Sequence, residues 1–145
     1  GIDPNVGEGF RPLARIASGG ELSRLMLALM GAGMALGKQD AEALTLVLDE
    51  VDAGLGGETA LAVGEAIHGL GKRHQVLAVT HLAQVASRAG QHGHLSKQTQ
   101  AGRTRSHLDW LDGEGRVREL ARLLSGPPDR PEALSHARSL LGAQA

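Results

Sequence analysis

The chain has 145 residues, enough for one domain with a substantial hydrophobic core. Its 15 lysines and arginines nearly balance its 16 aspartates and glutamates, so the net charge of −1 excludes attraction of nucleic acid by overall positive charge. The absence of cysteine excludes disulfides and thiolate metal sites and is compatible with a cytosolic protein. No apolar run is long enough to span a membrane, and a start at Gly1 rather than Met predicts a piece of a larger protein.

The first third of the chain predicts a loop followed by a helix. Residues 1–17 are typical of a loop that contains a short strand over Leu13–Ile16. Apolar residues then recur at helical spacing and predict a helix from about Gly20 to Gly33. These apolar residues are Leu22, Leu25, Met26, Leu29 and Met30.

The middle of the chain predicts a strand–helix–strand unit. Thr45–Leu48 is a short apolar run, typical of a parallel strand that is covered on both faces. A helix is expected over Glu58–Leu70, and a second apolar strand over Val76–Thr80. Because the links between these segments are short, a right-handed crossover with parallel strands is expected. A short helix is predicted over Leu82–Ala89.

The last third predicts a hairpin and two closing helices. Polar, alternating segments over His92–Gln100 and Arg103–Leu111 flank Ala101-Gly102, which is typical of a β-hairpin. Helices are predicted over Val117–Leu124 and Ala133–Leu141. The predicted fold class is therefore α/β, with short parallel strands flanked by helices, a β-hairpin and closing helices.

Two adjacent carboxylates, Asp49 and Glu50, end the first predicted strand. Ligands of open parallel sheets bind at the carboxyl ends of the strands. A carboxylate there can hold Mg²⁺ directly or through water, and the next one can orient and polarise an attacking water. The alternative interpretation is that the strand simply ends and both acids face solvent.

The second predicted strand also ends in polar residues, Thr80 and His81. Because parallel neighbours end on the same edge of a sheet, His81 is expected near Glu50. A histidine there can hydrogen-bond a phosphate oxygen or the attacking water, although a lone histidine at a strand end is more often structural.

The stretch Ser18-Gly19-Gly20-Glu21 has the pattern of a capping box, in which Ser18 caps a helix and Glu21 reaches back to it. Taken alone, this pattern only marks the start of a helix. The two glycines, however, leave the free N–H groups of the helix terminus open to close approach by a phosphate.

These motifs occur in an order that resembles the head of an ABC-type ATPase. The sequence SGGE, rather than SGGQ, resembles the SMC-like branch that maintains DNA. Within that branch, the stretches LARIASGGELSRLMLAL, LDEVDAGLGGETA, VTHLAQVA and RVRELARLLSG resemble the RecN family of bacterial DNA double-strand-break repair proteins. The resemblance runs from Leu13 to about Leu124 and is weaker in the predicted hairpin.

The resemblance implies a role for each matching residue. Ser18, Gly19, Gly20 and Glu21 match the signature motif, which binds ATP held by the opposing subunit. Asp49 and Glu50 match the Walker B carboxylates, of which Asp49 helps to position Mg²⁺ and Glu50 is the general base. Asp52 matches the D-loop, and His81 matches the switch histidine that acts with Glu50 in catalysis.

The phosphate-binding Walker A motif, GxxxxGK[ST], does not occur in the sequence. The resemblance therefore implies that residues 1–145 form a single C-terminal lobe, and that the N-terminal half of the same head supplies Walker A. The isolated chain is predicted to bind ATP weakly and to hydrolyse essentially none. The implied partners are that N-terminal half, a second head in an ATP-dependent dimer, and DNA through the full protein, which acts at the nucleoid in the bacterial cytoplasm with no membrane contact.

Two alternatives remain open at this point. The chain could be the head lobe of another SMC-like or ABC-type ATPase, although Glu21 and the RecN-like stretches argue against a transporter. It could also be a non-enzymatic interaction module that kept the fold and lost turnover. An intact Glu50 argues against that second alternative, because an inert lobe needs no general base.

Other polar residues are interpreted as structural. His92 and His94 could form a metal pair, but exposed histidines are the favoured interpretation. Trp110 is expected to pack against the edge of the sheet. The remaining basic residues are expected to be solvated, although those of the hairpin could touch a phosphate backbone; these residues are Lys97, Arg103, Arg105, Arg116, Arg118 and Arg122.

Overall fold

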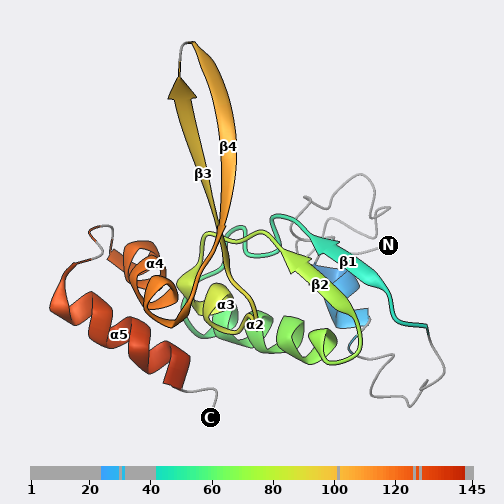
Figure 1. The fold of residues 1–145 in the computed structure, drawn as a ribbon. Coiled ribbons are helices and arrows are strands. Elements are labelled where there is room, and N and C mark those ends of the chain that lie inside the picture. The colour runs from blue at the N-terminus through green and yellow to red at the C-terminus, as the bar shows by residue number, and fades with distance from the viewer. Residues whose placement is uncertain are drawn as a thin grey trace, which may run out of the picture.

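The computed structural model describes residues 24–29, 31, 42–100, 102–125, 127 and 129–142. Within these residues the chain forms four strands and several helices that pack around two small cores (Figure 1). The predicted strand over Leu13–Ile16 lies outside the described residues, as does most of the predicted helix over Gly20–Gly33. Residues 24–29 of that second element are helical, which confirms this part of the prediction.

The first unit is a parallel crossover. Strands β1 (Thr45–Leu48) and β2 (Gln75–Ala78) pair in parallel and are joined by helix α2 (Gly57–Gly71), as predicted. The register places Leu48 opposite Ala78. β2 ends two residues earlier than predicted, and just beyond its end Val79 N–H still donates to the Leu48 carbonyl at 2.9 Å.

One core lies between this two-stranded sheet and α2. Its buried residues are Leu27, Leu48, Val51 and Leu70, and partly buried Leu46, Val63, Ile67 and Val76 pack against them. The prediction that both faces of the strands are covered is wrong for the part of the chain that the structure describes. Val47 and Leu77 form a cross-strand pair on the opposite face and are 71% and 49% exposed.

The second core joins three helices. Helix α3 (Ala83–Ser87) is shorter than predicted, and helices α4 (Gly113–Ser125) and α5 (Pro131–Gly142) both begin earlier than predicted. α4 begins early because Asp112 Oδ1 accepts from Gly115 N–H at 2.8 Å, which is the geometry of a helix cap. The core is rich in alanine and consists of buried Ala83, Ala86, Val117, Leu120, Ala121, Ala133 and Ala137.

The two units meet where α2 contacts α3. Gly64 of α2 is buried there, and a Cβ on it would lie 3.1 Å from the Gln84 carbonyl oxygen and 3.2 Å from Val85 Cα. The backbones of the two helices can approach this closely only because residue 64 has no side chain.

The predicted hairpin is confirmed and stands out from the body of the molecule (Figure 1). Strands β3 (Gly93–Gln100) and β4 (Arg103–Trp110) pair antiparallel, with Gln100 opposite Arg103. Gly102 has φ +73°, which suits glycine in a tight turn. Every residue of β4 is exposed, so the ribbon receives little support from the body.

These elements confirm the predicted α/β organisation, with parallel strands, flanking helices, a hairpin and closing helices. Among the helices that the structure describes, none combines the length and apolar character needed to cross a membrane.

Candidate functional site

The carboxyl ends of β1 and β2 meet at one edge of the sheet, as predicted. Asp49 and Glu50 follow β1 directly and are exposed, while Thr80 and His81 follow β2 after one residue. The His81 side chain is 72% exposed, so its imidazole can be reached from solvent. The structure therefore places the predicted residues Asp49, Glu50 and His81 along the same edge.

Glu50 adopts an unusual backbone conformation. Its φ of +53° lies in the left-handed region, which costs a residue with a Cβ about 1–2 kcal/mol. A turn follows at once, since Ala53 N–H donates to the Glu50 carbonyl at 3.1 Å and Leu55 N–H to the Asp52 carbonyl at 3.0 Å. Strained residues of this kind concentrate at functional sites, and here the strain lies at the predicted general base.

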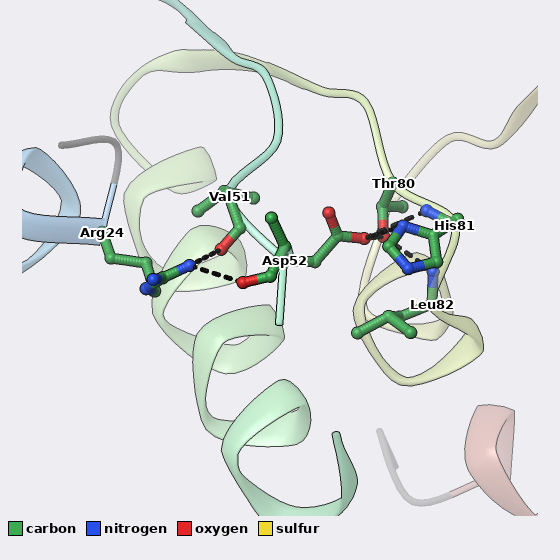
Figure 2. Close-up of polar contacts among 7 residues, drawn as sticks. Arg24, Val51, Asp52, Thr80, His81 and Leu82 are labelled. Carbon is green, nitrogen blue, oxygen red and sulfur yellow. Dashed lines mark hydrogen bonds and ion pairs between the residues drawn. The ribbon is translucent and has the colours of Figure 1, made fainter. Parts of the chain in front are cut away.

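This turn brings Asp52 back beneath the edge, where its side chain contacts the segment that follows β2 (Figure 2). Asp52 is only 2% exposed. Its Oδ2 accepts a hydrogen bond from the Thr80 hydroxyl and another from the His81 backbone N–H at 3.0 Å, and lies 3.2 Å from His81 Nδ1. Thr80 Oγ1 in turn accepts from Leu82 N–H at 3.0 Å, so the network reaches the start of α3.

The electrostatics of Asp52 follow from these contacts. Burial by itself raises the pKa of this carboxyl. The hydrogen bonds from Thr80 and His81, together with the charge of the His81 ring, outweigh burial and leave the pKa of Asp52 below its ordinary value. The carboxylate is therefore ionised at neutral pH although it is buried.

Arg24 holds the same turn from the other side (Figure 2). One guanidinium nitrogen donates to the Val51 carbonyl at 3.3 Å and to the Ala53 carbonyl at 3.0 Å. Nothing in the sequence indicated this contact, although Arg24 lies in the helix predicted to begin near Gly20, six positions after Ser18. Thr80 was also given no specific role, and its place beside His81 at a strand end was the available signal.

The signature residues Ser18, Gly19, Gly20 and Glu21 lie outside the described residues. No group of three or more histidine or acidic side chains that could hold a metal occurs within the described part of the chain. The donor set at the edge nevertheless fits Mg²⁺ bound through Asp49, since Mg²⁺ usually takes one or two carboxylates and completes its shell with water and substrate phosphates.

The surroundings of three residues at the base of the hairpin differ from those predicted. Arg116 is not solvated, because it donates to the Ala89 carbonyl at 2.6 Å and to the Ser87 carbonyl at 3.4 Å. Trp110 does not pack against a sheet edge and is 68% exposed. His92 is half-buried, and burial together with the nearby Arg116 charge lowers its pKa. These three groups line an open cavity of about 600 Å³ at the base of the hairpin, and none of the predicted site residues lines it.

The other basic residues of that region remain at the surface. Arg118 is exposed, and Arg122 forms two hydrogen bonds to Glu119 at 2.7 and 2.8 Å. The hairpin residues Lys97, Arg103 and Arg105 are exposed, as predicted.

Comparison with known proteins gives several close relatives, whereas no family model matches the chain. The chain is 50% identical over 137 residues to the DNA repair protein RecN of Deinococcus radiodurans, which covers 94% of this chain and 23% of that protein. It is 46% identical over 144 residues to RecN of Treponema pallidum, covering 99% of this chain and 24% of the relative. It is 42% identical over 140 residues to RecN of Vibrio cholerae, covering 97% of this chain and 24% of the relative.

One solved structure, from work on ATP-driven dimerization and DNA stimulated activation of SMC ATPases, is 21% identical and has a TM-score of 0.49. It covers 82% of this chain and 68% of that one, a similarity too slight to support an argument. The sequence relatives are decisive, and the chain spans about a quarter of their length. With 42–50% identity over nearly all of its residues to these proteins, the chain belongs to the RecN family.

Proposed function

We propose that this chain is the C-terminal lobe of the ATPase head of a RecN-type protein, which acts in DNA double-strand-break repair and recombination in the bacterial cytoplasm. The observation that carries the proposal is the edge where β1 and β2 end. There, two adjacent carboxylates follow one strand and a histidine follows its parallel neighbour, at the position where open parallel sheets bind their ligands.

Each residue at this edge has a role in the proposed reaction. Glu50 orients a water and accepts its proton as the water attacks the γ-phosphate of ATP. Asp49 would hold Mg²⁺ through water, and the ion would offset negative charge on the phosphates. His81 offers an exposed ring nitrogen to the γ-phosphate or to the attacking water.

The exposed apolar surface supports a partner for this lobe. Parallel sheets are normally covered on both faces, yet Val47, Leu77 and Val79 are exposed. Leu95 and Leu108 form an exposed cross-strand pair on the hairpin, next to Trp110. We propose that the N-terminal half of the same head, which carries Walker A, covers these surfaces and completes the sheet.

The first test compares ATP hydrolysis by the chain alone with hydrolysis by the chain mixed with its N-terminal half, each with and without DNA. Turnover by the mixture only, with none by the chain, is the expected result. A mixture that forms a complex and remains inert would instead favour the non-enzymatic interaction module. Hydrolysis by the pure chain, abolished by Glu50→Gln, would contradict the split head.

The signature residues have a separate role in this proposal. Ser18, Gly19, Gly20 and Glu21 contact ATP held by the opposing head, whereas Glu50 and His81 act on ATP in their own head. Ser18→Arg should therefore abolish ATP-dependent dimerisation, measured by light scattering, and leave ATP binding largely intact. Equal loss of dimerisation and ATP binding would contradict this division of roles.

A further inference from the structure

The contacts of Asp52 fix one side of the His81 ring. A single oxygen, Oδ2, receives the Thr80 hydroxyl and the His81 backbone N–H, and His81 Nδ1 lies 3.2 Å from that same oxygen. The Asp52 side chain is 3% exposed and the His81 side chain 72% exposed. Nδ1 of the His81 ring therefore contacts the buried Asp52 carboxylate, while most of the ring is exposed to solvent.

The chemistry of these groups decides which nitrogen carries the proton. An ionised carboxylate can only accept hydrogen bonds, so the ring nitrogen that faces it must be the donor. In the neutral imidazole this places the proton on Nδ1 and leaves the lone pair of Nε2 directed away from Asp52. The contact of Nδ1 with the carboxylate at 3.2 Å thus selects the tautomer and the direction of the other nitrogen.

We propose that Asp52 is a positioning residue within its own subunit, which together with Thr80 holds His81 with Nδ1 inward and Nε2 presented at the sheet edge. Asp52 was predicted only to match the D-loop, and no contact with His81 was predicted for it. The consequence for catalysis rests on the proposed ATPase function, whereas the orientation of the ring does not.

The orientation can be measured directly on the 145-residue chain by NMR of the ¹⁵N-labelled histidine side chains. We expect neutral His81 to be the Nδ1–H tautomer in the wild type. In Asp52→Asn we expect a return toward the mixture of tautomers that an unconstrained imidazole shows. An unchanged His81 tautomer in Asp52→Asn would overturn the proposal.

The chain offers a matched control. His107 Nε2 lies 3.0 Å from Asp109 Oδ1 in a second histidine–aspartate pair, in which both side chains are exposed. Asp109→Asn removes a carboxylate of the same kind from a histidine on strand β4 of the hairpin. It should leave the His81 spectrum unchanged, which separates the local effect of Asp52 from loss of charge in general.

The catalytic consequence is measured in the head assembled from this chain and its N-terminal half. Asp52→Asn should lower kcat by about 10- to 100-fold, part of the roughly 10²–10⁴-fold that a positioned acid–base group contributes. The KM for ATP should change by less than about twofold, because the ring acts on the reacting phosphate rather than on binding. Asp109→Asn should keep the wild-type kcat.

Substitutions at Thr80 provide a second test if Asp52→Asn does not fold. Thr80→Ser keeps the hydroxyl that donates to Asp52 and should retain the wild-type kcat and His81 tautomer. Thr80→Val removes the hydroxyl at similar volume and should shift both. Identical behaviour of Thr80→Val and wild type would overturn the proposal. An inactive wild-type head would count against the proposed ATPase function alone, since the NMR result would still decide the orientation of His81.

Discussion

The contact between α2 and α3 gives a stability prediction in which two opposing effects can be separated. Gly64→Ala places a methyl group 3.1 Å from the Gln84 carbonyl oxygen and 3.2 Å from Val85 Cα. These are backbone atoms of α3, whose position is also fixed by the core around Ala83 and Ala86. The crowded helices must move apart or strain, which typically costs about 1–3 kcal/mol.

Replacing glycine by alanine inside a helix also stabilises it, by about 1 kcal/mol. Gly69 lies in the same helix with nothing within 4 Å of the point that an alanine methyl group would occupy, so Gly69→Ala shows this gain alone. Both variants replace a glycine of α2 by alanine, so this gain in helix stability cancels when their free energies of unfolding are compared. The free energy of unfolding of Gly64→Ala should therefore be lower than that of Gly69→Ala by the steric cost of about 1–3 kcal/mol.

The assay is urea unfolding of both variants and the wild type, followed by circular dichroism, with the midpoints compared at an unchanged slope. Gly69→Ala should unfold at a higher urea concentration than the wild type, and Gly64→Ala at a lower or similar concentration. If Gly64→Ala is as stable as Gly69→Ala, the inferred close approach of α2 and α3 is refuted.

Three further predictions concern the core, the buried carboxylate and the hairpin. Leu120→Ala should lower the free energy of unfolding by about 2–5 kcal/mol in the same urea assay, because Leu120 is fully buried between the closing helices. The lowered pKa of Asp52 adds stability above the ordinary Asp pKa of about 3.9, and this contribution is lost as the pH falls through the folded-state pKa. Acid titration of Asp52→Asn should therefore show a shallower loss of stability below about pH 4 than the wild type; an equal slope would show that Asp52 contributes nothing. Trp110 is the single tryptophan of the chain, so its emission should shift to shorter wavelength when a Trp-free N-terminal half binds, and an unchanged spectrum would exclude the hairpin from that interface.

The sequence predicted the elements well where local pattern determines structure. The apolar run of β1, the periodic helix α2 and the glycine turn of the hairpin are all recognisable without tertiary information. That Glu50 and His81 follow strands ending on the same edge also followed from topology, because parallel strands joined by a crossover end on the same side.

The parts that the sequence could not predict depend on contacts between distant segments. Three acids follow β1 within four residues, and their order does not show which of them turns inward. In the structure Glu50 has a left-handed backbone, and Arg24 holds the carbonyls of the residues on either side of Asp52. Asp52 itself turns inward to Thr80. Arg116 has the composition of a solvated helix residue, yet the packing of α4 against the end of α3 brings its guanidinium onto backbone carbonyls.

The sequence also could not predict which apolar faces are covered by this chain. An apolar strand predicts burial on both faces, but it does not say which chain provides the cover. Val47 on the sheet and Trp110 on the hairpin are exposed, because the described residues leave most of each side chain uncovered. The chain spans about a quarter of its sequence relatives, and the N-terminal half of the head is the proposed cover for these faces.

The most direct test of the central claim is ATP turnover by the assembled head with Glu or Gln at position 50, with ATP binding measured in parallel. Glu50→Gln should bind ATP as well as the wild type and lose nearly all hydrolysis, because the water has lost its base. Wild-type turnover by Glu50→Gln would contradict the assignment of this sheet edge as the catalytic site.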